Sequence, residues 1–378
     1  MKKDNRKEVK FINYKAYLRA VIILGVCILL LNIMFRVSKA FATTYCNTVY
    51  HAFARGLSAI MSIFPFSFIE ITCYVCGLII FYCIVKLIVL LIKYHQKAVR
   101  HFFFYKLKRY LLNLAIILLS VWLMYSLTCL PLYHRVDFAA CANIIPKDHS
   151  VDDLIGLYEL LVSDANELSG KVTRDSDNVF TIEGTDYNTL SVDAMEALSD
   201  DYPVLSDYYP KAKGILASNL MSRTLTMGFY CPYTMEANYN RNMPDIDLPH
   251  TICHELSHLS GFIHEDEANF IGYLACMKSE SDEFKYSGTV SVLEYVINQL
   301  YDNTTYEQFC EFYDEMDSLV ILDIQKEDAY WENYRHTAIS NASSSANDAY
   351  IKINGDTEGE RRYDMVTDLL LEYYDGEY

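Results

Sequence analysis

Three long apolar segments constrain this chain more than any other feature. They cover residues 18–35, 69–92 and 111–133, and each contains 18 to 24 residues that are almost all apolar. A helix of that length can cross a hydrocarbon core of about 30 Å. The first segment is longer than the apolar core of about 7–15 residues in a secretory signal peptide, and no cleavage motif follows it. We therefore expect residues 1–133 to form a membrane region with three transmembrane helices in contact with the lipid bilayer.

Basic residues predict the orientation of these helices. The segment before the first span and the loop between the second and third spans are both rich in Lys and Arg, whereas the loop between the first and second spans has few. Because basic loops stay in the cytoplasm, the N-terminus and the second loop should be cytoplasmic. The sequence thus predicts a multi-pass protein of the cell membrane, with residues 134–378 forming an extracytoplasmic domain.

The charge of this second part excludes one class of partner. Residues 134–378 carry a net charge of −31, whereas residues 1–133 carry +14. An acidic surface repels phosphates, so we expect no nucleic-acid binding. For the same reason we expect the domain to stand away from anionic lipid headgroups.

Periodicity predicts a mainly α (α+β) outer domain with a small β-sheet. We expect helices at 151–169, 191–200, from about Pro210, 249–260, 265–277, 289–301, 306–338 and 361–374. Residues 223–240 indicate one or two short strands; the segment 234–240 is either an ordinary strand or an edge strand that could pair with an extended peptide. Residues 340–350 are predicted to be a surface loop. The eleven cysteines show no regular spacing, and we expect Cys253 and Cys276 to be buried thiols rather than a disulfide.

Residues 254–258, His-Glu-Leu-Ser-His, give the strongest chemical signal. On a helix, His254 and His258 share one face, with Cβ atoms about 6 Å apart. Two imidazoles so placed can bind one Zn²⁺ at about 2.0–2.1 Å each. Glu255 would lie beside the metal, where it could act as a base toward a zinc-bound water. Since a proline precedes the motif and a glycine follows it, a helix of suitable length is expected, and the sequence predicts one Zn²⁺ per chain.

The identity of the third ligand remains open from spacing alone. His264 completes H-E-x-x-H-x-x-G-x-x-H, the ligand spacing of metzincin peptidases. However, an acidic stretch with a following apolar stripe begins at residue 265 and indicates a new helix. We therefore favour Glu267, in the first turn of that helix, over the alternative metal ligand His264, with Glu265 or Asp266 as remaining alternatives. His250 is expected to be solvated or to support the ligands.

The segment 254–276 resembles the core of a bacterial membrane-protein family designated domain of unknown function 3810. The likeness extends to residues 65–70, 209–222, 228–240, 284–288 and 350–370. The family is similar to gluzincin-type zinc metallopeptidases, and the Glu-Ala-Asn at 267–269 is similar to the Glu-bearing helix of IrrE-like metallopeptidases. The resemblance implies a zincin-like domain with His254, His258 and Glu267 as ligands and Glu255 as base. It departs from the thermolysin-like pattern at Ile271, where an Asp is expected, so the partner that orients His254 is unidentified.

These features predict a membrane-anchored zinc peptidase acting on peptides or proteins of the cell envelope. Glu255 would accept a proton from the zinc-bound water and pass it to the leaving amine. Tyr363 is a candidate oxyanion stabiliser, and Arg361, Arg362 and Tyr286 are weaker candidates. The alternative is a non-catalytic zinc-binding membrane sensor or interaction protein, against which an intact Glu255 argues. An intramembrane protease would need its motif within a span, and the motif lies about 120 residues beyond the third.

Overall fold

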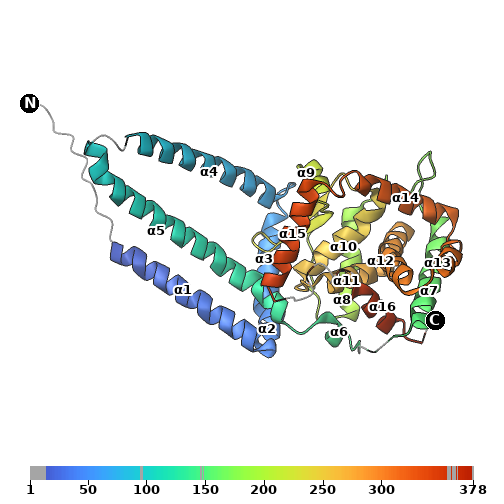
Figure 1. The fold of residues 1–378 in the computed structure, drawn as a ribbon. Helices are drawn as coiled ribbons and strands as arrows, with labels where there is room; N and C mark the ends of the chain where they lie inside the picture. Colours follow the sequence, from blue (N-terminus) through green and yellow to red (C-terminus); the bar gives the residue numbers. More distant parts are fainter. Residues whose placement is uncertain are drawn as a thin grey trace, which may run out of the picture.

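Three long helices extend from one side of a mainly helical body (Figure 1). This computed structural model describes residues 14–93, 97–144, 147, 149–355, 359, 363 and 365–376. The long helices are α1 (Tyr14–Val37), α4 (Phe68–Ile92) and α5 (Lys97–Thr128), and each contains a stretch long and apolar enough to cross a membrane. The three predicted spans are therefore present as helices. The basic segment before residue 14, on which the predicted orientation partly depends, lies outside the described residues.

The third span ends five residues earlier than predicted. Helix α5 stops at Thr128, and a short 3₁₀ helix, Leu130–His134, follows it. Pro131 lies in the first turn of that 3₁₀ helix. Proline lacks a backbone N–H and its ring clashes with the preceding helical turn, so an α-helix cannot continue undisturbed through this position.

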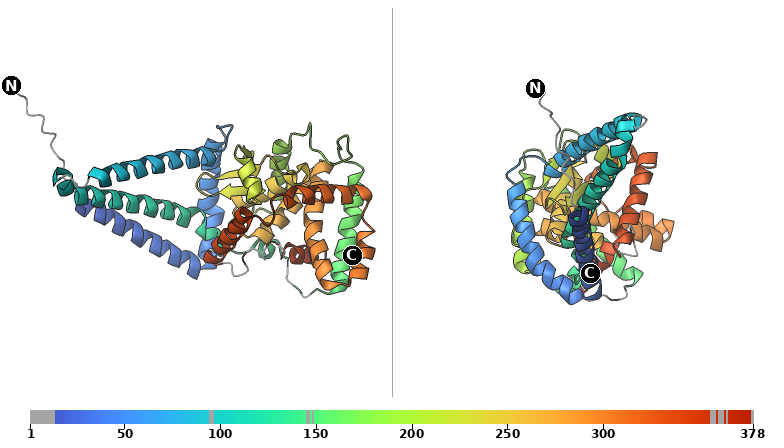
Figure 2. Two further views of the ribbon diagram at one scale, coloured as in Figure 1. Left: turned by 45° about the horizontal axis from the view of Figure 1, so that its top comes forward. Right: turned by 90° about the vertical axis from the view of Figure 1, so that its left-hand side faces the viewer.

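The connection between α1 and α4 is itself helical and lies against the body. It comprises α2 (Lys39–Tyr45), the π-helix η1 (Cys46–Tyr50) and α3 (His51–Met61), which together run across the border between the long helices and the body (Figure 2). Tyr50 is 1% exposed and belongs to the same hydrophobic core as the helices of the body. The predicted division at residue 133 remains a prediction, but the core is built from residues on both sides of it.

The body is formed by helices around a small sheet. Its elements are α6 (Phe138–Cys141), α7 (Val151–Ser169), α8 (Tyr187–Asp201), β1 (Lys213–Ile215), α9 (Ser218–Arg223), β2 (Gly228–Cys231), β3 (Glu236–Asn240), α10 (Leu248–Leu259), α11 (Glu265–Lys278), α12 (Asp282–Asn303), α13 (Tyr306–Tyr313), α14 (Ser318–Glu332), α15 (Ala338–Ile353) and α16 (Val366–Tyr373). The predicted helices at 151–169, 249–260 and 265–277 are thus confirmed. So is the expectation for Cys253 and Cys276, which are buried free thiols.

Three predicted elements differ from the structure. The segment after Pro210 forms strand β1 rather than a helix, and the predicted helix 306–338 is divided into α13 and α14. The predicted loop 340–350 lies within helix α15. Ser and Asn have modest helix propensity, but Thr337 begins α15 with a capping box that Ser340 completes. The N-cap thus supplies a helix-start signal that composition alone conceals.

The sheet corrects the expectation of an edge strand at 234–240. Its strand order is β1-β3-β2, with β1 parallel and β2 antiparallel to the central β3. All five residues of β3 are buried. Strand β1, which the sequence did not predict, pairs with one side of β3. The edge strand beside helix α10, which carries the His-Glu-Leu-Ser-His motif, is therefore β2.

Two buried carboxylates join α4 to the sheet. Glu236, in β3, accepts hydrogen bonds from the backbone N–H groups of Phe68 (2.9 Å) and Ile69 (3.0 Å) at the start of α4. Glu70 accepts hydrogen bonds from the backbone of Leu216 (2.9 Å) and Ala217 (2.8 Å) in the body. A helix start has unpaired N–H groups and a positive partial charge, so both carboxylates are favourably placed. The second span is therefore fixed to the sheet by hydrogen bonds in both directions.

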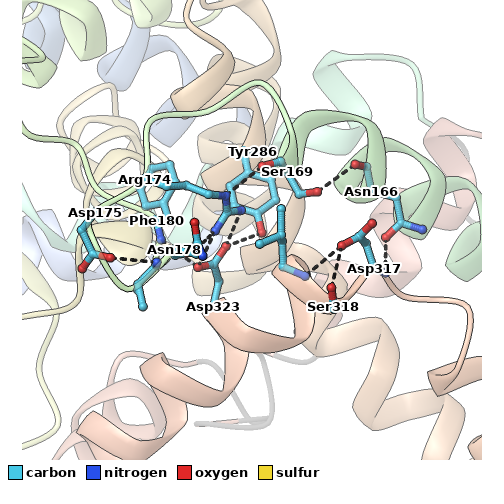
Figure 3. A network of polar contacts seen from close by, with 12 residues as sticks. Asn166, Ser169, Arg174, Asp175, Asn178, Phe180, Tyr286, Asp317, Ser318 and Asp323 are labelled. Atoms are coloured by element: carbon cyan, nitrogen blue, oxygen red, sulfur yellow. Dashed lines mark hydrogen bonds and ion pairs between the residues drawn. The ribbon is translucent and has the colours of Figure 1, made fainter.

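A buried ion pair holds α14 against the rest of the body (Figure 3). Asp323 accepts hydrogen bonds from Arg174 (2.9 and 3.1 Å), the Phe180 backbone (2.8 Å) and the Tyr286 hydroxyl (2.7 Å). Its side chain is fully buried. Asp323→Ala would leave the Arg174 charge and two further donors without their acceptor. We expect a loss of about 3–5 kcal/mol in the free energy of unfolding, measured by denaturation of the detergent-solubilised protein.

Asp317 provides the control for this prediction. It lies at the N-cap of the same helix, is exposed, and accepts a hydrogen bond from Leu319 N (2.9 Å). Asp317→Ala should cost only about 1 kcal/mol. Equal losses for the two variants would show that the Asp323 network does not stabilise the fold as described.

Candidate metal centre

Helix α10 presents the two motif histidines to helix α11. It begins at Leu248, with Pro249 in its first turn, and ends at Leu259. At Gly272 of α11, an added Cβ would lie 3.1 Å from the backbone N and 3.3 Å from the Cα of His254. These distances are shorter than most Cβ contacts in proteins, so a larger residue at this position would push the two helices apart. The first turn of α11 is thereby brought next to the histidines.

Three side chains converge on one point between these helices. The distance from Glu265 Oε2 to His254 Nε2 is 3.2 Å, and that to His258 Nε2 is 3.6 Å. His254, His258 and Glu265 form a group whose potential ligand atoms all lie within 4.8 Å of one another. Ligands at about 2.0–2.1 Å from one tetrahedral zinc ion are about 3.3 Å apart. The spacing and the donor types therefore fit a His₂Glu zinc site.

Glu267 does not take the position predicted for it. Its carboxylate is buried and accepts a hydrogen bond from the backbone N–H of Phe138. Glu265 is the first residue of α11, and Glu267 is two residues further along. Successive residues of a helix are turned by about 100°, so Glu267 projects about 200° away from Glu265. The third member of the cluster is accordingly Glu265, one of the alternatives that the sequence left open.

His264 also lies outside the cluster. It is the N-cap residue of α11, and its imidazole packs edge-on against the ring of Tyr133 at a centroid distance of 5.7 Å. The metzincin-type spacing therefore does not bring this histidine to the other two in the structure.

Hydrogen bonds to Nδ1 fix the orientation of both histidines. His254 Nδ1 lies 2.7 Å from Asn269 Oδ1, and His258 Nδ1 lies 2.8 Å from the carbonyl oxygen of Phe262. Because both partners are oxygen acceptors, each Nδ1 donates its proton to its partner, and each ring turns its Nε2 toward Glu265 as the available ligand atom. Asn269, the last residue of the Glu-Ala-Asn segment, is thus the partner of His254 that sequence reasoning did not find. It lies four residues after Glu265, on the same face of α11, and that spacing was the available signal.

Glu255 is buried beside this cluster with one oxygen unpaired. Its side chain is 4% exposed, and Oε2 has no hydrogen-bond partner among the described residues. A Cβ at Gly228 would lie 2.5 Å from Oε1, so the edge strand β2 packs directly on this carboxylate. Burial raises the pKa of Glu255 to about 7, although His254 and His258 oppose the shift. A carboxyl group with such a pKa can both accept and donate a proton near neutral pH.

The family comparison covers all of these residues. A family model described as protein of unknown function (DUF3810) matches residues 45–371. The chain belongs to the DUF3810 family. No curated protein and no solved structure matches it. The DUF3810 match begins at the last residue of α2 and ends within α16, so it includes η1 and α3 of the connection as well as the His₂Glu cluster.

In this DUF3810 protein the cluster opens into a cavity of about 610 Å³. The cavity is lined by residues of β2, α10, α11, α12 and α15, and also by Cys129 and Tyr133, which follow α5 directly. Since the third apolar stretch ends at Thr128, the cavity adjoins the end of that span. The candidate site therefore lies close to the end of the third span. The net negative charge of the domain had instead predicted that the domain stands away from lipid headgroups.

Tyr363 is the candidate oxyanion donor that the structure brings to this DUF3810 cavity. It lines the cavity together with Glu255 and Glu265. Burial, with a further contribution from Glu265, raises its pKa well above the usual range, so its hydroxyl remains a proton donor. Tyr286 instead donates to Asp323 in the buried ion-pair network, away from the cavity. Arg361 and Arg362 lie outside the described residues.

His250 supports the cluster rather than joining it. It lies one turn before His254 on α10, and its Nε2 is 3.1 Å from the backbone carbonyl oxygen of Asn269. Burial, together with the nearby His254, lowers the pKa of His250 to about 4, so the ring is neutral. Of the two expectations for this residue, a solvated position is wrong and a supporting position agrees with the structure.

Proposed function

We propose that this protein is a membrane-anchored, zinc-dependent metallopeptidase of gluzincin type that hydrolyses peptide bonds outside the cytoplasmic membrane. The observation that carries the proposal is the combination of a three-ligand cluster with an unpaired, buried carboxylate beside it. A structural zinc site has no need of a base at Glu255, whereas a hydrolytic site requires one. The alternative of a non-catalytic zinc sensor leaves this buried carboxylate without a purpose.

The residues of the cavity have distinct roles in this proposal. His254, His258 and Glu265 would hold the ion. When bound, Zn²⁺ would act as a Lewis acid toward the scissile carbonyl and lower the pKa of water. Glu255 would accept the proton of the attacking water through Oε2 and transfer it to the leaving nitrogen. Tyr363 would donate a hydrogen bond to the oxygen that becomes negatively charged.

Strand β2 would hold the substrate. It is one of the two edge strands of the described sheet, it packs on Glu255, and its residues line the cavity. An extended peptide can add to such an edge through backbone hydrogen bonds, which would place a peptide bond alongside Glu255. Substrates would then be bound mainly by their backbone at this strand.

The test combines zinc content with hydrolysis. Full-length protein in detergent would be analysed for zinc by mass spectrometry and incubated with a peptide mixture of varied sequence. We expect one zinc per chain and cleavage that disappears after treatment with a chelator and returns when zinc is added. Folded protein without zinc, or cleavage that survives zinc removal, would contradict the proposal. Bound zinc without cleavage of any peptide would favour the sensor.

A further inference from the structure

The cavity is lined by more acidic residues than the candidate metal centre uses. The described lining includes five carboxylates and neither Lys nor Arg. Glu255 and Glu265 belong to the candidate zinc site. The remaining three are Asp247, Glu294 and Glu327. No step of the proposed reaction uses them.

These three carboxylates come together from separate elements. Asp247 directly precedes α10, Glu294 lies on α12 and Glu327 lies on α14. Asp247 is 9% exposed and accepts a hydrogen bond from Trp331 Nε1 at 3.0 Å. Since three elements each contribute an acid to one cavity, the group is a product of the tertiary fold rather than of local sequence.

Glu327 is buried, and its carboxylate has no polar partner among the described residues. Its side chain is 5% exposed and faces the cavity, and within the part of the chain that the structure describes it forms no hydrogen bond and no ion pair. Arg335, a positive charge in the same region, is instead paired with Asp328 and Glu332. Burial raises the pKa of Glu327 to about 7 against the opposing influence of Arg335. Burial and the charge of Glu327 likewise raise the pKa of Asp247.

A cationic ligand would compensate the negative charge of these three acids. A carboxylate buried without a counter-charge is unfavourable, whereas an ammonium or guanidinium group beside it gains strong charge-assisted hydrogen bonds. The cavity supplies two further acids to share the positive charge. A neutral or anionic ligand would leave the repulsion between the acids in place.

We propose that this end of the cavity binds a positively charged group of the peptide substrate, an inference that rests on the proposed function. Asp247 precedes His254 by seven residues along α10, which corresponds to about 10 Å along the helix axis. An extended peptide advances about 3.3 Å per residue. The charged group therefore lies within about three residues of the cleaved bond. It is either a Lys or Arg side chain or a free amino terminus.

The test compares matched peptides. One set carries Lys, Arg or an uncharged residue at each of the three positions on either side of the cleaved bond, and a second set repeats these with an acetylated amino terminus. Full-length wild type and Glu327→Gln are compared. We expect wild type to prefer charged peptides and Glu327→Gln to reduce the charged-to-neutral ratio of kcat/KM about 10- to 100-fold. Loss of the preference on acetylation would identify the amino terminus as the group bound, and its persistence would identify the side chain.

Two further variants keep the test decisive. Glu307→Gln removes the same charge from an exposed position on α13, outside the cavity lining, and should leave the ratio unchanged. Binding of the same peptides to Glu255→Gln, with and without Glu327→Gln, measures the preference without hydrolysis. If wild type cleaves peptides but neither cleavage nor binding distinguishes charge, the subsite proposal is overturned while the peptidase proposal stands. If nothing is cleaved but charged peptides bind through Glu327, the peptidase proposal is overturned while the cationic subsite stands.

Discussion

Glu265→Gln is expected to abolish stoichiometric zinc binding, whereas Glu267→Gln is not. The Glu265 carboxylate lies 3.2 and 3.6 Å from the two histidine Nε2 atoms, at the spacing of ligands around one zinc ion. An amide of the same shape is a much poorer zinc ligand. Loss of a residue that merely supports a ligand already lowers metal affinity about 10- to 100-fold, so loss of a ligand should exceed this. Zinc affinity would be measured by titration against a competing chelator.

The Glu267 variant is the matched control. Gln at this position keeps an oxygen that can accept the hydrogen bond from the Phe138 backbone, so the fold should be preserved. His264→Ala should also retain zinc, because that ring packs against Tyr133 outside the cluster. Zinc loss in Glu267→Gln with retention in Glu265→Gln would restore the ligand set that the family resemblance implies and refute the one described here.

Glu255→Gln is expected to reduce kcat by about 10²- to 10⁴-fold while zinc remains bound. The amide cannot accept the proton of water, but it fills the same space against Gly228. Hydrolysis of the best peptide from the mixture would be measured alongside zinc content. A variant that loses its zinc would indicate that Glu255 holds the metal rather than a proton. A variant with full activity would remove Glu255 from the reaction.

Local pattern was sufficient for the parts of the site that lie within one helix. His254, Glu255 and His258 are brought together by a spacing of four residues, and that geometry holds wherever the segment is helical. The three apolar spans and helices α7, α10 and α11 were predictable for the same reason. Each depends on periodicity over many residues rather than on a single position.

The third ligand could not be predicted because it depends on where a helix begins. A shift of one residue turns a side chain by about 100°, and helix ends are the least certain feature of a sequence-based prediction. The choice between Glu265 and Glu267 therefore required the contact between α10 and α11. The proximity of the acids at 247, 294 and 327 could not be predicted either, since they are brought together by the packing of three elements distant in sequence.

The apolar helices of this protein cannot be separated from its folded body. The reasons are the hydrogen bonds of Glu236 and Glu70 and the burial of Tyr50 in the common core. A cut between the apolar helices and the body would not free an intact body, because α3 and the start of α4 contribute to its buried interior. Proteolytic release of the body would therefore disrupt this shared interior, and so would replacement of the apolar helices by those of another protein. If the three apolar helices cross a membrane, the candidate site is held beside that membrane.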